Sequence, residues 1–194
     1  WLTRSLAAFD DSIGGRLLIL TGDPREVVPR VASAAGATQV HIAQDSGPYG
    51  QWRDDQVEAR LADAGVRLVR TGSPYAVTPG RVRKPDGTPY RVYTPFYRAW
   101  CAHGWREPAH QPDPRWVTPL ESDPLPQVEL PHDLPPVGEL AALRRWEAFR
   151  DTALADYDER RNRPDLRGTS MLSAHLRWGE IHPRTLLAEL LPAG

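Results

Sequence analysis

The hydroxyl side chains of residues 169–173 are the strongest candidates for chemistry in this sequence. Thr169, Ser170 and Ser173 follow a glycine where a helix is expected to begin, and a run of arginines precedes them. Free N–H groups at a helix N-terminus and the helix dipole both favour phosphate. The pattern therefore favours an anion site, although Ser and Thr also begin many helices as simple caps.

Three helical stretches must position these hydroxyls. The first ends before Pro164, because proline lacks an N–H donor and its ring obstructs the helix. The second is expected to open at residues 168–170, with a hydroxyl capping its first turn, and to end at Gly179. Pro183 then opens the third helix, whose apolar face still needs partners. That face comprises Leu186, Leu187 and Leu190.

The helix that precedes this region is expected to begin at Glu139. Its apolar residues are spaced for one helical face, and Tyr157 continues the pattern. These residues are Leu143, Trp146, Phe149 and Ala153. Taken alone, Tyr157 would be interpreted as a core or half-buried tyrosine.

The first hundred residues repeat a unit of helix, glycine, short apolar strand and turn. An opening helix ends at Gly14 and Gly15, and further helices run from the Asp23 cap to Gly36 and from about Tyr49 to Gly65. Apolar strands are expected at 17–20, 40–43 and 66–69. Strands that alternate with helices predict an α/β domain with a parallel sheet. The loops after these strands contain no glycine fingerprint for a dinucleotide.

Residues 106–138 separate this domain from the helical region. The stretch holds nine prolines and few apolar residues, which is typical of an extended connector. We therefore expect an α/β domain over 1–105, a connector over 106–138 and a truncated helical domain over 139–194.

The spacing of several motifs resembles the photolyase/cryptochrome family. The helical motif begins at Tyr157 and continues through Arg161, Pro164, the 168–173 segment Gly-Thr-Ser-x-Leu-Ser, Gly179 and Pro183. In the α/β half, residues 45–54 and 90–100 resemble the antenna domain of that family. The resemblance implies an incomplete Rossmann-like antenna domain, followed by the first helices of an all-α FAD-binding domain.

The same resemblance implies FAD as the cofactor. It assigns cofactor binding to Tyr157, Thr169, Ser170, Met171, Leu172 and Ser173, and it makes Arg161 a candidate neighbour of phosphate or DNA. It implies no catalytic residue within this chain. An antenna chromophore, either folate or deazaflavin, is also implied. Its identity stays open, because Tyr49, Gly50 and Gln51 stand where folate-binding members carry polar side chains.

The reading favoured by the resemblance is a fragment of a deoxyribodipyrimidine photo-lyase that repairs pyrimidine dimers in DNA. The chain begins inside a helical stripe without Met, and the family's first strands would precede it. We expect the fragment to be inactive and weakly stable alone, and the full-length protein to be a monomer. A cryptochrome-type light receptor and a stand-alone nucleotide-binding or interaction module are the alternatives.

Composition restricts the remaining function classes. The net charge of −1 predicts no general affinity for nucleic acid, so any DNA site must be local. The single cysteine, Cys101, excludes an internal disulfide and is expected to be buried. The histidines show no metal-ligand spacing, so no metal is expected. No long apolar run or signal peptide is visible, which favours a cytoplasmic protein without membrane contact.

Overall fold

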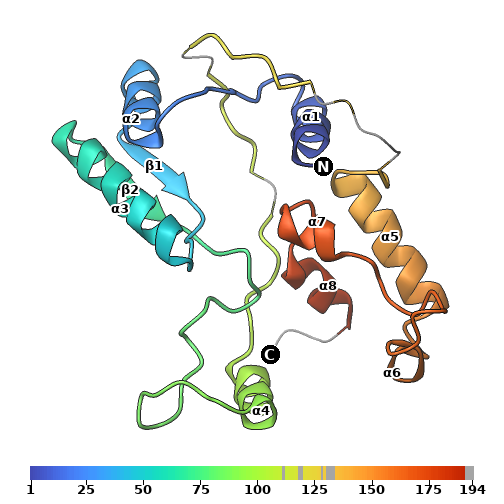
Figure 1. The fold of residues 1–194 in the computed structure, drawn as a ribbon. Helices are drawn as coiled ribbons and strands as arrows, with labels where there is room; N and C mark the ends of the chain where they lie inside the picture. Colours follow the sequence, from blue (N-terminus) through green and yellow to red (C-terminus); the bar gives the residue numbers. More distant parts are fainter. Residues whose placement is uncertain (111, 118–119, 128, 130–133, 191–194) are drawn as a thin grey trace. The chain divides into compact units, whose positions relative to one another are not determined.

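The computed structural model describes residues 1–110, 112–117, 120–127, 129 and 134–190 (Figure 1). It contains two compact units. The first comprises Trp1–Leu17 and Leu125–His182, and the second comprises Leu18–Pro124 and Pro183–Gly194. These units describe which parts of the backbone pack together. They do not test the domain limits expected from the sequence, and those limits stay a prediction.

The second unit contains a parallel pair of strands. Strand β1, Gln39–Ile42, pairs with β2, Arg67–Arg70, so that Val40 lies opposite Leu68. Helix α2, Pro24–Ala34, precedes β1, and helix α3, Pro48–Asp63, connects the two strands (Figure 1). The helix and strand order confirms the expected α/β class for this part of the chain.

The core of this unit is apolar and lies where α2 and α3 meet the strands. Five buried side chains form it: Ala32, Val57, Leu61, Val66 and Leu68. Val57 and Leu61 are four positions apart on α3, so they project from one face of the helix. Arg70 of β2 also donates to Glu58 at 2.6 Å and to Asp55 at 2.7 Å, which ties the strand to the same helix.

Local sequence signals explain the ends of these helices. The Asp23 carboxylate accepts a hydrogen bond from the Arg25 N–H at 2.9 Å, and Pro24 occupies the first turn, as the sequence predicts. Gly65 follows α3 with φ of 70°. A residue without Cβ adopts this left-handed conformation at little cost, so the chain can turn into β2.

The strand expected at residues 17–20 is absent, and this prediction is wrong. Instead, Ile19 N–H donates to Ser122 Oγ at 2.9 Å, and Asp123 N–H donates to the Ile19 carbonyl at 2.7 Å. Thr21 N–H donates to the Asp123 carboxylate at 2.6 Å. The backbone of this segment therefore bonds to an irregular segment far along the chain rather than to a neighbouring strand.

Two further helices belong to the second unit. Helix α4, Tyr93–His103, has no buried residue. Helix α8 spans Pro183–Leu190 and begins with the expected proline. Arg184 of α8 donates to the carbonyl of Ala76 at 2.9 Å, which attaches α8 to the loop that follows β2.

The first unit is helical. It contains α1, Leu2–Ser12; α5, Glu139–Thr152; α6, Tyr157–Arg160; and α7, Ser173–Arg177. Ala142, Trp146 and Phe149 form the buried face of α5. The expectation that α5 continues to Tyr157 is wrong, because the helix ends at Thr152 and Ala153 departs from helical geometry with φ of −136°.

None of the helices in the described part of the chain has the length and apolarity needed to cross a bilayer. Between α4 and α5, the described residues form neither helix nor strand. This irregular backbone is what the high proline content of the connector predicts.

Candidate functional site

Tyr157 begins the segment that the sequence singles out. Its ring packs edge-to-face against Phe149 of α5, with centroids 6.0 Å apart, and it remains partly exposed. The Arg161 guanidinium lies 6.0 Å from the centre of the same ring, within the range of a cation–π contact. Tyr157 is therefore held by α5 on one side and contacted by Arg161, and 38% of its surface remains exposed.

Gly168 brings the next part of the segment against α6. A Cβ at this position would lie 2.5 Å from Cβ of Arg160 and 2.9 Å from its carbonyl oxygen. Any other residue would push the chain away from α6. Glycine here is therefore a requirement of close backbone approach.

The five residues after Gly168 alternate between solvent and the interior. Leu172 is 2% exposed, whereas Met171 is 68% exposed and adopts a left-handed φ of 53°. Thr169 and Ser173 are exposed, and Ser170 is half-buried. Among the described residues, no hydrogen bond uses the hydroxyls of these three side chains. Leu172 thus anchors a short segment that presents polar groups outward.

The predicted position of the helix start is wrong. Helix α7 begins at Ser173 rather than at residues 168–170, and no side chain caps its N-terminus. The left-handed Met171 explains the delay, because an αL residue interrupts the run of right-handed dihedrals that a helix needs. Gly179, with φ of 72°, follows the helix as predicted.

The arginines around this segment differ in their partners. Arg160 pairs with Asp156 at 2.8 Å, and Arg163 pairs with Asp165 at 2.6 Å. Arg177 lies 5.6 Å from the Trp178 ring. Arg161 makes no ion pair within the described residues, so its charge is the least compensated of those that the structure brings near Tyr157.

A buried polar cluster lies beneath α7. His175 of α7 is fully buried, and its Nδ1 contacts Glu180 Oε2, while Trp1 Nε1 donates to Glu180 Oε1 at 3.1 Å. The Trp1 ring also packs edge-on against His175 at 5.2 Å. We call Trp1, Ser5, His175 and Glu180 the polar cluster. It joins α7 to α1 and so fixes the helix that follows the hydroxyl segment.

The polar cluster keeps Glu180 ionised. Burial alone would raise the pKa of this carboxyl group. Hydrogen bonds from the Ser5 hydroxyl, the Gly138 N–H and His175 outweigh burial, so the pKa of Glu180 lies below its ordinary value. A buried carboxylate with several donors is stabilised in its charged form.

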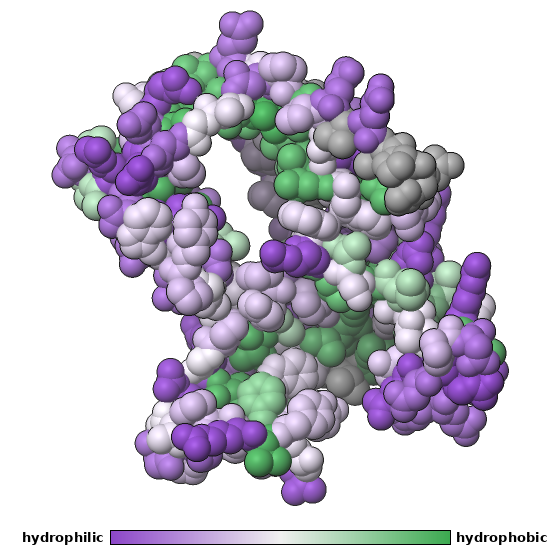
Figure 2. Space-filling model, in the orientation of Figure 1, coloured by the Kyte–Doolittle hydropathy of each residue, from purple (hydrophilic) through white to green (hydrophobic). Residues whose placement is uncertain are grey.

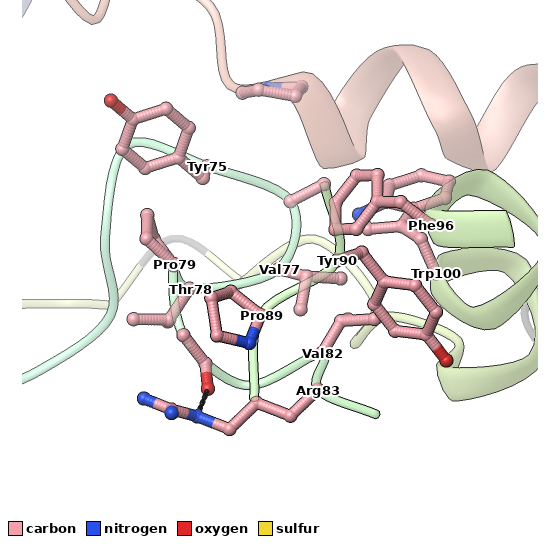
Figure 3. Close-up of a pocket in the computed structure, with 13 residues that line it drawn as sticks. Tyr75, Val77, Thr78, Pro79, Val82, Arg83, Pro89, Tyr90, Phe96 and Trp100 are labelled. Atoms are coloured by element: carbon pink, nitrogen blue, oxygen red, sulfur yellow. Dashed lines mark hydrogen bonds between the residues drawn. The ribbon is translucent and has the colours of Figure 1, made fainter. Parts of the chain in front are cut away.

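A separate cavity of about 590 Å³ lies in the second unit, between the loop after β2 and α4 (Figure 3). Tyr90, Phe96 and Trp100 form aromatic walls, and Val77, Val82 and Pro89 add apolar surface. Arg83 at its edge donates to the carbonyls of Gly80 and Gly87, at 2.8 and 3.0 Å. The cavity therefore suits a flat apolar group, and it was not predicted from the sequence.

The signal that could have found this region is a helical spacing of aromatic residues. Tyr93, Tyr97 and Trp100 lie four and three positions apart, on one side of α4. Cys101 on the same helix is exposed, so the expectation that it is buried is wrong. A hydrogen bond with Cys101 raises the pKa of Tyr97. Among the described residues, no three His, Cys, Asp or Glu side chains are grouped to hold a metal ion.

Comparison with known proteins gives a consistent result. The family model described as DNA photolyase matches residues 1–115. An uncharacterised 31.6 kDa protein from the atpI 5′ region of Synechococcus sp. strain PCC 6716 is 39% identical over 90% of this chain. The deoxyribodipyrimidine photo-lyase of Synechococcus sp. strain ATCC 27144 is also 39% identical, over 87% of the chain.

The fold comparison agrees with the sequence comparison. The crystal structure of a bacterial class III photolyase from Agrobacterium tumefaciens matches 97% of this chain with a TM-score of 0.79 and 30% identity. The chain spans 65% of the length of the first Synechococcus relative, 38% of the second and 42% of the Agrobacterium structure. The similarity thus extends over nearly all of this chain and over less than two thirds of each relative.

Proposed function

This chain belongs to the DNA photolyase family, and from that premise we propose that the full-length gene product is a deoxyribodipyrimidine photo-lyase. The proposed reaction is light-driven splitting of cyclobutane pyrimidine dimers in DNA. The observation that carries the proposal is 39% identity, over 87% of this chain, to a relative that bears this name.

The proposed cofactor is FAD, held in part by residues 157–173. The residues assigned to it are Tyr157, Thr169, Ser170, Met171, Leu172 and Ser173. Two observations support the assignment. The three hydroxyls have no hydrogen-bond partner among the described residues, and Gly168 allows the backbone to pack closely against α6. Hydroxyls that lack internal partners can donate to phosphate oxygens, and such charge-assisted bonds are stronger than neutral ones.

The residues of this chain would bind and orient the flavin, which when bound supplies the light-driven electron transfer. Arg161 is proposed to contact phosphate or the DNA backbone, because no carboxylate among the described residues neutralises it. The dimer would be turned out of the duplex for repair, which is less costly at a damaged base step than at a paired one.

The proposal includes an antenna chromophore, folate or deazaflavin, without an assigned site. It also includes a cytoplasmic protein that acts as a monomer. Thermal melts with added folate and deazaflavin would identify a chromophore that binds, because a ligand that binds only the folded state raises the melting temperature.

Repair of dimer-containing DNA under blue light tests the proposed activity. The full-length gene product, loaded with FAD, is expected to restore intact pyrimidines in the light and not in the dark. The 194-residue chain alone, with added FAD, is expected to repair nothing, because a buried cofactor needs a site that encloses most of its surface. Dark controls and a sample without protein separate enzymatic repair from photolysis.

One result would contradict the proposed activity, and another would contradict the expected inactivity of the 194-residue chain alone. A full-length protein that binds FAD and responds to light without repairing dimers would indicate a cryptochrome-type receptor. Light-driven repair by the 194-residue chain would show that the remaining walls of the flavin site are not needed.

A further inference from the structure

Helix α4 carries a row of stacked aromatic side chains on its surface. The Tyr93 and Tyr97 rings lie 5.7 Å apart at 17°, and Tyr97 and Trp100 lie 6.4 Å apart at 13°. Trp105, just beyond the helix, continues the row 4.8 Å from Trp100 at 27°. We call these four residues the aromatic row.

The two tyrosines of the aromatic row are open to solvent, whereas Trp100 and Trp105 are half-buried. Tyr93 is 72% exposed and Tyr97 is 47% exposed, and α4 contributes no buried residue to any core. Where Figure 1 places α4, Figure 2 shows hydrophobic groups and pale groups of intermediate hydropathy beside strongly hydrophilic ones. Trp100 also lines the cavity of Figure 3, so the row and the cavity form one continuous aromatic surface.

The surrounding residues carry a local positive charge. Residues 81–106 hold six Lys and Arg and a single acid, Asp86, which gives this stretch a net charge of +5 within a chain of −1. The basic residues are Arg81, Arg83, Lys84, Arg91, Arg98 and Arg106. No ion pair among the described residues uses any of them. The rest of the chain has a net charge of −6, so this stretch is net positive within an otherwise net-acidic chain.

Stacked exposed rings beside uncompensated cations are the combination that binds single-stranded nucleic acid. Every base has a π face that can stack on an aromatic side chain, and guanidinium groups attract the phosphates between the bases. We propose that the aromatic row and the basic residues of 81–106 bind single-stranded DNA without sequence preference. This inference needs neither flavin nor light, so it stands apart from the proposed repair activity.

A second exposed aromatic pair in the same chain lacks both the parallel stacking and the positive surroundings of the aromatic row. Tyr49 and Trp52 of α3 are 71% and 53% exposed, with centroids 6.0 Å apart, but their rings are tilted by 38°. Helix α3 carries four acids and two arginines, and Arg53 pairs with Asp54 at 2.6 Å. Repulsion from these carboxylates disfavours a phosphate backbone, so this pair is the matched control.

Fluorescence anisotropy with labelled oligothymidine, in the dark and without flavin, tests the inference on both the 194-residue chain and the full-length gene product. Tyr93→Ala combined with Tyr97→Ala is expected to weaken binding about tenfold or more. The corresponding Phe substitutions should retain affinity, and Tyr49→Ala with Trp52→Ala should leave it unchanged. Circular dichroism of each variant confirms that it is folded.

Salt dependence tests the basic residues separately. The logarithm of the binding constant is expected to fall linearly with the logarithm of the salt concentration. For each arginine that contacts a phosphate, substitution by Gln (Arg91→Gln or Arg98→Gln) should make this slope shallower by about 0.7. A duplex of the same length should bind more weakly than the single strand, because paired bases cannot stack on the row.

The inference is overturned if the Tyr93→Ala/Tyr97→Ala variant binds as well as the unmodified chain, or if duplex and single strand bind equally. It is also overturned if these substitutions abolish self-association of the chain while DNA affinity is unchanged. That result would make the aromatic row a protein contact. Loss of dimer repair in the light assay bears only on the proposed enzyme activity, since undamaged DNA in the dark is the ligand here.

Discussion

Leu61 and His175 are both completely buried, and different interactions hold them. Leu61 lies in an apolar core, where its contacts with neighbouring side chains remove apolar surface from water. His175 lies in the polar cluster, where Glu180 and Trp1 must meet it in a specific geometry. An apolar core tolerates any well-packed shape, whereas a buried polar group depends on one particular partner.

The two sites also differ in how the chain assembles them. The apolar core draws on residues 32–68, a continuous stretch of helices and strands. The polar cluster joins Trp1 to Glu180, which are 179 positions apart. The first can therefore form from local α/β packing, and the second forms only when both ends of the first unit are in place.

Truncation of the apolar core is expected to have the largest effect on stability. Leu61→Ala removes a fully buried side chain, and the lost burial together with the remaining cavity should cost about 2–5 kcal/mol in the free energy of unfolding. Urea denaturation of the 194-residue chain measures this. Leu140→Ala, at a position 62% exposed, is the matched control and should change stability by less than about 0.5 kcal/mol.

Replacement of the buried carboxylate is expected to come next. Glu180→Gln keeps the shape of the side chain but removes the charge that His175 and Ser5 face, which should cost about 1–3 kcal/mol. Denaturation beside the exposed control Glu147→Gln measures the difference. If Glu180→Gln and Glu147→Gln were equally stable, the charge of Glu180 would add nothing to stability beyond what a neutral amide supplies.

Acid pH should remove that difference. Because the pKa of Glu180 is lowered in the folded state, the carboxylate stabilises the fold above its ordinary value of 4.5, and the contribution is lost as pH falls through the lowered pKa. The gap between the unmodified chain and Glu180→Gln should therefore narrow below pH 4.5. A gap that widens with acid would mean that burial raises this pKa instead.

The exposed carboxylate of Asp23 should give the smallest effect. A hydrogen bond from Arg25 lowers the pKa of Asp23 to about 2, so its contribution is present above 3.8 and is lost as pH falls towards 2. Asp23→Asn keeps an oxygen that can cap α2 and loses only the solvent-exposed ion pair. High salt should abolish the effect of Asp23→Asn but not that of Glu180→Gln, because salt screens exposed charges more strongly than buried ones. Equal salt dependence would contradict the difference in burial.

The difference between the two buried sites also explains what the sequence could predict. Val57 and Leu61 reveal the core face of α3 through their spacing, and Asp23, Pro24 and Gly65 mark where helices start and stop. These signals are local, and the structure confirms them. The parallel pairing of β1 and β2 follows from the same alternation of strands and helices.

The failures occur where the outcome depends on distant partners. Leu17–Leu20 has the composition of a strand, but its backbone bonds to residues 122 and 123. The left-handed Met171 delays α7, although no local signal distinguishes it from a helical residue. The pairing of His175 with Glu180 and Trp1 could not be predicted either, because periodicity identifies apolar faces and not polar partners.

The flavin content of the full-length gene product, measured by absorbance after purification, most directly tests the assignment of residues 157–173 to the cofactor. Thr169→Ala combined with Ser170→Ala should lower FAD affinity about tenfold or more, because hydrogen bonds to charged groups are worth about 1.5–3 kcal/mol each. Ser33→Ala, on the exposed surface of α2, should have no effect. FAD retention by the double variant equal to that of the unmodified protein would contradict the assignment.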